Sequence, residues 1–532
     1  MTPVGLFELV LALLAAALAL SALASRTGLP PAAALVVGGM ALALVPGLPD
    51  FHLDPDLILV LFLPPLLMES AYFTVWRDLR AEMVPVLALA IGAVAFTTAC
   101  VGIAAHLVVP GLPLAACFTL GAIVSPPDAV AAKAVLQRLK LPRRLVTILE
   151  GESLVNDASG LVLYRFSVAA AMTGSFSAPE ALGQFAWLAG GGIAIGLAGG
   201  FMIVQLLRRV HDADLAVALS LIFSWAIYIG AERLGASGVL AVVAAGILFG
   251  LLQHTALEAR VRLRADAVWG IVVYGLEALV FVLIGLALRG VLERQTAALL
   301  ATAVPLMLVS IAVVVVSRLL WVFGFAESMR AVLKRFRRDR TPSSLLPSLM
   351  VGWAGMRGVV TLAVALALPD AFPGRDQLLL AAFAVILFTV LVQGSTFGPL
   401  IRWLGIDGFA DPEGTQMNEA AARVRVNQAT LAFVETLSEA GEPLHPRLIE
   451  EYRLRTEATT RLRDDPLAST ERRQAHFSAA LAATAAGRTE LNRLHREGHI
   501  HESVLSVIEQ EFDLEELRLR RLGKLAGGAP TH

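Results

Sequence analysis

Cysteine and charge are both scarce in this sequence. Only two of its 532 residues are cysteine, Cys100 and Cys117, and both fall within apolar runs. They offer no disulfide framework and no metal-binding spacing. Charged residues make up 16% of the chain, whereas hydrophobic residues make up 57% and the mean hydropathy is +0.71. Because soluble globular domains carry about 25% charged residues, this composition excludes that class and predicts a polytopic membrane protein.

Signals for nucleotide binding and for export are also missing. The C-terminal part contains no glycine-rich phosphate loop, so no ATP or NAD site is expected there. No cofactor and no nucleic-acid partner is predicted. The N-terminus lacks a basic segment and a cleavage site, which favours a retained first span over a signal peptide.

Long apolar runs fill the first three-quarters of the chain. A helix needs about 20 apolar residues to cross a bilayer. The sequence therefore predicts an all-α membrane protein with thirteen transmembrane helices in its first 404 residues. The expected spans are 4–24, 29–46, 56–74, 83–108, 113–137, 144–171, 184–207, 214–231, 236–252, 267–288, 297–323, 345–368 and 377–400.

Basic residues are distributed unevenly between the loops on the two sides of the membrane. Alternate loops, beginning with the one at Arg26, contain 19 Lys and Arg residues, whereas the opposite loops contain four. Cytoplasmic loops of membrane proteins carry the excess of Lys and Arg. The N-terminus is therefore expected outside and the C-terminus in the cytoplasm, which requires an odd number of spans.

The composition changes after the last expected span. From about residue 406 onward the chain carries 16 Lys and Arg residues against 21 Asp and Glu residues, with apolar residues at helical spacing. This pattern predicts a cytoplasmic domain of about four helices. The expected division is a transmembrane domain at 1–404 and a helical domain at 405–532, for which a regulatory role is left open.

Two consecutive prolines interrupt the fifth span, within the Ser-Pro-Pro-Asp sequence at 125–128. Because proline has no backbone N–H, the carbonyls of Ala122 and Ile123 lose their helical partners. Such carbonyls are tolerated in a membrane only where they line a polar cavity or bond to protein. Asp128 is expected at the start of the second half-helix, where the helix dipole favours a negative charge.

A second interruption is expected in the twelfth span. There Gly352, Gly355 and Gly358 recur at a spacing of three, beside Arg357. Two interrupted helices at corresponding positions of two halves are typical of secondary transporters with inverted repeats. Spans 1–6 and 8–13 would form two six-helix repeats of opposite orientation, so that the fifth span corresponds to the twelfth. For either break alone, a kink with a capping residue is the alternative.

Five polar residues gather within the sixth span, at 150–157. Ionisable groups at mid-membrane are costly and usually mark an ion or proton path. Ser153 and Asp157 share one helix face, and Glu152 and Asn156 share the adjacent one. A partly desolvated Asp157 takes either a monovalent cation or a proton. This competition, combined with alternating exposure, is sufficient for obligatory exchange.

Other buried polar groups have more than one interpretation. Glu152 and Arg357 are expected to form a structural ion pair, because removing one partner of a buried pair is costly. Glu69, near the cytoplasmic end of the third span, is either a second cation ligand or an interfacial acid. Three polar residues of the last span, Gln393, Ser395 and Thr396, are interpreted as helix-packing groups. The residues without an assigned role are Glu150, Arg165 and Glu277.

Four motifs, in this order and on these spans, resemble one protein family. They are Leu63-Pro-Pro-Leu-Leu-Met-Glu69, Gly121-Ala-Ile-Val-Ser-Pro-Pro-Asp128, Glu150-Gly-Glu-Ser-Leu-Val-Asn-Asp157 and Met356-Arg-Gly-Val-Val-Thr361. Over about residues 4–404 the chain resembles the monovalent cation:proton antiporters of the CPA1 group. These are bacterial sodium/proton antiporters related to the animal sodium/proton exchangers.

The resemblance implies a homodimer in the inner (plasma) membrane, in which a core domain moves against a dimer domain during pH homeostasis. It implies that Asp157 binds the cation and the proton, with Asn156 as its partner. Ser153, Asp128 and Glu69 would complete the site, and the transported metal cation would contact Asp157, Asp128 and Ser153. An Asn-Asp pair implies electroneutral exchange of one cation for one proton.

One position departs from the family pattern. Many members have Thr before the aspartate of the broken helix, where this chain has Pro127. A hydroxyl ligand is therefore absent, and Ser125 or a freed carbonyl would replace it. The choice among Na⁺, K⁺ and Li⁺ is thus left open.

The main prediction is a Na⁺/H⁺ antiporter embedded in membrane lipid, and the alternative is a K⁺/H⁺ antiporter on the same site. A cation channel fits the sequence less well. An intramembrane protease using Asp128 and Asp157 fits least well, so the chain is expected to be a secondary transporter and not an enzyme.

Overall fold

Helices are the only regular secondary structure in the residues that the computed structural model describes, which confirms the all-α prediction for them. The chain divides into two compact units, Met1–Asp411 and Pro412–His532, and each is described by itself. The residues that the structure describes are 3–27, 30–45, 55–128, 142–174, 178–292, 297–336, 346–404, 419–439, 446–464, 470–497 and 499–526.

Apolar helices dominate the first unit. Six stretches are both long and apolar enough to cross a membrane, and five shorter apolar helices accompany them. The six are Met83–Val108, Gly183–Leu207, Ala213–Arg233, Ala259–Ala287, Thr302–Ser328 and Arg375–Trp403. The protein is therefore a multi-pass membrane protein.

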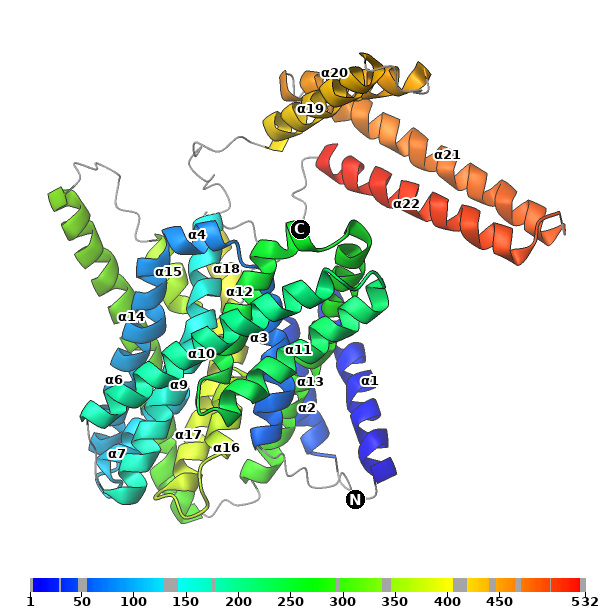
Figure 1. Ribbon diagram of the computed structural model, residues 1–532. Helices are drawn as coiled ribbons and strands as arrows, with labels where there is room; N and C mark the ends of the chain where they lie inside the picture. Colours follow the sequence, from blue (N-terminus) through cyan, green and yellow to red (C-terminus); the bar gives the residue numbers. More distant parts are fainter. Residues whose placement is uncertain are drawn as a thin grey trace. The chain divides into compact units, whose positions relative to one another are not determined.

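The helices of the first unit pack most extensively within two groups (Figure 1). Bundle one consists of α1 (Pro3–Thr27), α2 (Pro31–Ala43), α3 (Pro55–Phe73), α10 (Ala178–Leu207), α11 (Ala213–Arg233), α12 (Gly238–Ala256) and α13 (Ala259–Leu292). Bundle two consists of α5 (Met83–Leu87), η1 (Ala88–Ala93), α6 (Val94–Val108), α7 (Leu114–Val124), α9 (Arg143–Thr173), α14 (Ala297–Phe336), α15 (Leu346–Trp353), α16 (Val359–Leu366), α17 (Arg375–Phe388), η2 (Thr389–Gln393) and α18 (Gly394–Trp403). The short helix α4 (Trp76–Ala81) contacts α5 and α9 of bundle two.

Glycines allow the closest helix contacts inside bundle one. A Cβ atom at Gly39 of α2 would lie 2.3 Å from the carbonyl oxygen of Val282, and one at Gly285 of α13 would lie 2.3 Å from that of Val36. These two helices therefore touch backbone to backbone, as small residues permit in membrane proteins. The contact fixes the α2–α13 pair within bundle one.

Two features of bundle two place the site. The prolines end α7 at Val124, and the chain between α15 and α16 is not helical from Gly355 to Gly358. Two one-turn π-helices, η1 and η2, also interrupt the helices 83–108 and 375–403. Segments of π-helix often occur at functional sites. The two breaks meet inside bundle two, because α7 and α16 are in contact.

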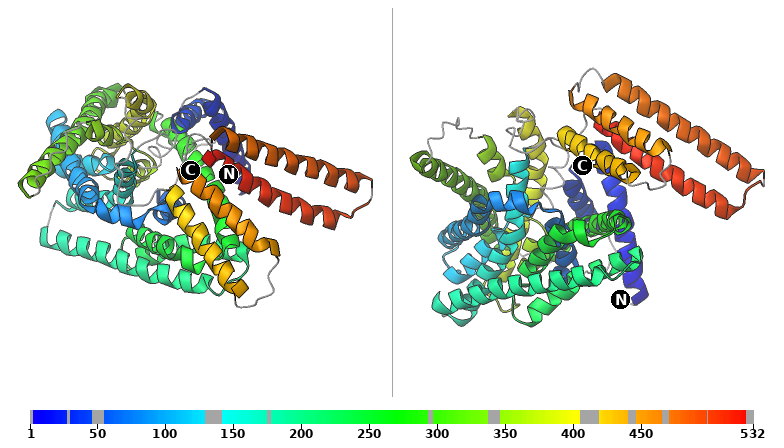
Figure 2. Two further views of the ribbon diagram at one scale, coloured as in Figure 1. Left: turned by 90° about the horizontal axis from the view of Figure 1, so that it is seen from above. Right: turned by 45° about the horizontal axis from the view of Figure 1, so that its top comes forward.

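The second unit consists of two helical hairpins. The helices α19 (Glu419–Glu439) and α20 (Pro446–Asp464) pack together, as do α21 (Thr470–Arg496) and α22 (Glu502–Ala526). Figure 2 shows the two helices of each hairpin running side by side. Ion pairs from Arg488 of α21 to Asp513 and Glu516 of α22, at 2.8 and 2.9 Å, connect the second hairpin.

Candidate cation and proton site

The carbonyls at the end of α7 are bonded by an arginine from the other broken helix. Arg357 is only 1% exposed. Its Nε donates to the carbonyl of Val124 at 2.8 Å and its Nη2 donates to that of Ser125 at 3.2 Å, while its Nη1 donates to the carbonyl of Gly355. A cation at a helix C-terminus also interacts favourably with the helix dipole. Arg357 therefore supplies donors to the carbonyls of Val124 and Ser125, which lose their helical partners where α7 ends.

A residue of the first break in turn caps the half-helix that follows the second break. The Asp128 carboxylate accepts a hydrogen bond of 3.3 Å from the N–H of Val359, the first residue of α16, and the Asp128 N–H donates to the Met356 carbonyl at 2.6 Å. A Cβ atom on Gly358 would lie 1.5 Å from Asp128 Oδ2, so only glycine fits there. Each break thus supplies the cap of the other, an arrangement that we call the reciprocal cap.

Asn156 connects α9 to the first break. Its side chain is fully buried, and its Nδ2 donates to the carbonyl of Pro127 at 2.6 Å. Its Oδ1 has no hydrogen-bond partner among the residues that the structure describes. Unpaired buried acceptors are rare in proteins and call for an explanation such as a water or ion ligand.

Asp157, the next residue of α9, is buried with 7% of its surface exposed. Asp128 is close enough for the two negative charges to repel each other. The described residues contain no group of three or more His, Cys, Asp or Glu side chains that could hold a metal ion. A cation at Asp157 would therefore draw most of its ligands from neutral oxygens, which suits a monovalent ion better than Zn²⁺.

The π-helix η1 packs against the same part of α9. The Ser159 hydroxyl donates to the carbonyl of Ala90 at 2.5 Å, and the Trp321 indole donates to that of Ala88 at 3.0 Å. A π-turn disrupts the regular helical hydrogen bonds, and these two side chains bond carbonyls in it. The wider turn brings η1 close behind Asn156 and Asp157.

Ser125, one candidate to replace the missing hydroxyl ligand, already has a partner. Its Oγ accepts a hydrogen bond of 3.1 Å from the Thr98 hydroxyl and lies 3.4 Å from the Ala122 carbonyl, which it can bond as donor. The other candidate, a freed carbonyl, is represented by Pro127, whose oxygen accepts from Asn156. In this conformation both groups stabilise the break.

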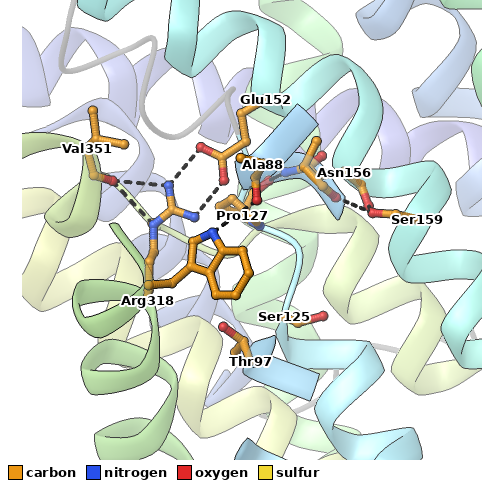
Figure 3. Close-up of polar contacts among 12 residues, drawn as sticks. Ala88, Thr97, Ser125, Pro127, Glu152, Asn156, Ser159, Arg318 and Val351 are labelled. Carbon is orange, nitrogen blue, oxygen red and sulfur yellow. Dashed lines mark hydrogen bonds and ion pairs between the residues drawn. The ribbon is translucent and has the colours of Figure 1, made fainter. Parts of the chain in front are cut away.

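The predicted pair of Glu152 and Arg357 is wrong. Glu152 instead forms a bidentate ion pair with Arg318 of α14, with Nη1–Oε1 and Nη2–Oε2 distances of 2.6 and 2.8 Å (Figure 3). Both side chains are at most 3% exposed. The physical reason is that Arg357 is occupied by the carbonyls of α7. Arg318 also donates to the Val351 carbonyl near the end of α15, at 3.1 Å, so it caps the other broken half-helix.

Arg318 was missed although the sequence contains a signal for it. It is a single charged residue within the otherwise apolar eleventh span, where an arginine is as costly as in the twelfth. Sequence separation gives no means of choosing between Arg318 and Arg357 as the partner of Glu152. Only the positions of α9, α14 and the second break within bundle two decide it.

Ser153 and Glu69, two predicted cation ligands, lie on different helices. Ser153 is half-buried on α9, one turn before Asp157. Glu69 is half-buried on α3 and lines an apolar cavity in bundle one, together with Met68, Tyr72 and Trp269. The structure thus brings together three of the predicted residues at the breaks: Asp157, Asn156 and Asp128. Glu69 lies apart from them on α3, a helix of bundle one that contacts α9 and α16.

Arg165, whose role the sequence left open, connects the two bundles. Its Nη2 lies 3.0 Å from Oε2 of Glu232 on α11, and Oε1 of the same glutamate accepts a hydrogen bond of 2.9 Å from the Gly238 N–H at the start of α12. Arg165 follows Asp157 on α9 by two turns. The ion pair therefore ties the helix that carries Asp157 to bundle one.

Comparisons with known proteins identify the family of this chain. Residues 10–403 match the family model described as "Sodium/hydrogen exchanger, transmembrane". The chain belongs to this family. Membership confirms the predicted resemblance, and it identifies the chain as a transporter and not an enzyme.

Several antiporters from other bacteria are similar to this chain in sequence. A "Sodium, potassium, lithium and rubidium/H(+) antiporter" from Bacillus subtilis is 30% identical over 506 residues, covering 92% of this chain and 74% of that protein. A protein of the same name from Bacillus pumilus is 32% identical, with 78% of this chain and 64% of that protein covered. The "Low-affinity Na(+)/H(+) antiporter NhaS1" from Synechocystis is 33% identical, with 76% and 75% covered.

A solved structure shows the same fold. The sodium proton antiporter MjNhaP1 from Methanocaldococcus jannaschii superimposes with a TM-score of 0.59 at 20% sequence identity. The match covers 77% of this chain and all of that chain.

The Glu152–Arg318 pair makes a testable prediction. The Glu152→Ala variant leaves Arg318 buried without a negative partner, which typically costs about 3–5 kcal/mol of unfolding free energy. We expect the melting temperature of the purified protein to fall accordingly. Adding Arg318→Met should restore part of the loss, because the unpaired charge is then gone.

The matched control is Arg357→Met in the same Glu152→Ala background. This second change removes the bonds to the carbonyls of α7, so it should lower the melting temperature further. Recovery with Arg357→Met and not with Arg318→Met would contradict the observed pairing.

Proposed function

We propose that this protein exchanges a monovalent cation, Na⁺ in the first place, for a proton, with both competing for the carboxylate of Asp157. The observation that carries the proposal is the buried Asp157 carboxylate at the meeting point of two broken helices. It lies beside an Asn156 oxygen that has no hydrogen-bond partner among the described residues. Antiporter relatives and the family match support the same activity.

The charge count at the site supports an electroneutral mechanism. Asp128 is occupied in capping α16, Glu152 is neutralised by Arg318, and Asn156 is uncharged. Asp157 is then the one group whose charge changes during the cycle. It is neutral with one Na⁺ bound and neutral with one proton bound, so each crossing carries no net charge. The proposed stoichiometry is one cation for one proton.

Alternating access follows from the two bundles. Bundle two contains Asp157 and the reciprocal cap, and it contacts bundle one less extensively than each bundle contacts itself. A shift of bundle two against bundle one would expose Asp157 to one side and then to the other. The Arg165–Glu232 pair joins the bundles and would have to break in that movement.

Several further features belong to the proposal. They are thirteen spans in two inverted six-helix repeats, an external N-terminus, a cytoplasmic helical domain after residue 404 with a regulatory role, a homodimer in the plasma membrane, and participation of Ser153, Asp128 and Glu69 in cation passage. The loop asymmetry of Lys and Arg supports the orientation.

Exchange of K⁺ or Li⁺ at the same site is the second candidate. The names of the two Bacillus relatives include potassium and lithium as well as sodium. The side-chain hydroxyl missing at Pro127 leaves backbone and amide oxygens, which discriminate among monovalent cations by site size. Measuring exchange with Na⁺, Li⁺ and K⁺ in turn distinguishes the candidates.

The Asp157→Asn variant tests the site assignment. It removes the titrating group while keeping the size of the side chain, so Na⁺-dependent proton movement into proteoliposomes should be lost. The protein should still fold, as judged by its elution profile and melting temperature. Asp370→Asn is the matched control, because the Asp370 side chain is 98% exposed, and it should keep wild-type exchange. Exchange that persists in Asp157→Asn would exclude this carboxylate as the site.

Electroneutrality is tested by the cation gradient that stops net proton movement. For one-to-one exchange this balancing gradient equals the proton gradient and is the same at every membrane potential. For an electrogenic exchanger, the balancing gradient would change with the membrane potential. Each net charge moved contributes about 2.3 kcal/mol for each 100 mV, which corresponds to about a 50-fold change in the cation gradient. The potential is best imposed by a chloride gradient with a chloride ionophore, because K⁺ is a candidate substrate. A dependence on potential, or conduction without protons as in a channel, would contradict the proposal.

A further inference from the structure

Gln393 is a buried amide that packing does not explain. It closes the π-helix η2 and is 1% exposed. Within the described part of the chain, its side-chain oxygen is buried without a hydrogen-bond partner. Thr396, one turn later, differs: its hydroxyl accepts from the Trp353 indole at 3.1 Å and donates to the Val392 carbonyl at 2.6 Å. The interpretation as a helix-packing group therefore has a visible contact for Thr396, whereas the side-chain oxygen of Gln393 has none among the described residues.

An unpaired buried amide oxygen is unfavourable. Its desolvation typically costs about 1–3 kcal/mol, which an apolar side chain of similar size would avoid. Only three buried side-chain atoms in the described residues lack a partner: Asn156 Oδ1, Gln393 Oε1 and Ser310 Oγ. Two of the three are amide oxygens, and both stand beside a helix break. This distribution points to a shared purpose at the breaks.

The position of Gln393 mirrors that of Asn156. The Asn156 side chain bonds the first break at Pro127. On the other side, the hydroxyl of Thr389, one turn before Gln393 on η2, accepts a hydrogen bond of 3.0 Å from the Arg357 N–H in the second break. A Cβ atom on Gly394 would lie 3.2 Å from the Met356 sulfur, so η2 lies directly against that break. At each break, an element that makes a polar contact with the break also carries an amide oxygen without a partner among the described residues. This element is α9 at the first break and η2 at the second.

We propose that Gln393 is a cation-binding residue of the exchange pathway, whose Oε1 gives a passing Na⁺ a neutral oxygen ligand, directly or through one retained water. This inference rests on the proposed exchange at Asp157. Amide carbonyl oxygens are good ligands for hard cations and are not protonated at physiological pH. Gln393 therefore raises cation affinity without binding the competing proton, a role that a second carboxylate could not fill.

The test compares Gln393→Met with Ser310→Ala. Both variants remove an unpaired buried polar atom, so in both the melting temperature without Na⁺ should stay the same or rise. Only Gln393→Met should weaken Na⁺ binding. The apparent KM for Na⁺ should rise about tenfold, the magnitude of losing one hydrogen bond or ligand to a charged group, with little change in maximal rate. Gln393→Asn, which keeps the amide but shortens it, should lie between the two.

Stabilisation by Na⁺ provides a readout that does not depend on transport. A ligand that binds the folded state raises the melting temperature. We expect NaCl, compared with choline chloride, to stabilise wild type and Ser310→Ala and to stabilise Gln393→Met much less. Stabilisation of wild type without exchange would contradict the proposed function and leave the binding role of Gln393 intact. An unchanged KM and an unchanged Na⁺ effect in Gln393→Met, or a lowered melting temperature alone, would show that the amide is merely structural.

Discussion

The structure depends on the reciprocal cap between the two broken helices. Neither break could exist alone in a membrane, since each leaves backbone groups without helical partners where no lipid can bond them. Arg357 supplies donors to the end of α7, and Asp128 supplies an acceptor to the start of α16. Because each residue is itself part of the other break, the two interruptions stabilise one another. Asp157 lies next to this meeting point on α9, because the preceding residue, Asn156, donates to the Pro127 carbonyl of the first break.

The cap also determines how the buried charges are distributed. Arg357 is occupied by carbonyl groups, so Glu152 takes Arg318, and that arginine in turn bonds the end of α15 through the Val351 carbonyl. The buried charges thus serve different purposes. Arg357, Asp128 and Arg318 bond backbone groups at the breaks, and Glu152 neutralises Arg318. Asp157 is the group that changes its charge in the proposed cycle.

The sequence predicted the breaks well and the partners poorly. Paired prolines at 126–127 and the glycines at 355 and 358 act on their own backbone, so their effect can be derived locally, and the membrane class and family followed from composition and motifs. The partner of Glu152 depends on how α14 packs beside α9, which no spacing within one helix reveals. The π-helices η1 and η2 were not predicted. The side chains that bond carbonyls of η1, Ser159 and Trp321, are on other helices, so no local pattern reveals these contacts. The unpaired oxygen of Gln393 could be recognised only once its surroundings were known.

The central claim is that one carboxylate binds either Na⁺ or a proton. Its most direct test is the apparent KM for Na⁺ measured as a function of pH in proteoliposomes with equal pH on both sides. Competition for one site predicts that KM rises by about tenfold for each pH unit on the acid side, by mass action, while saturating Na⁺ restores the maximal rate. A KM that stays constant while the maximal rate falls with pH would show that the proton acts at another site, and it would contradict the account.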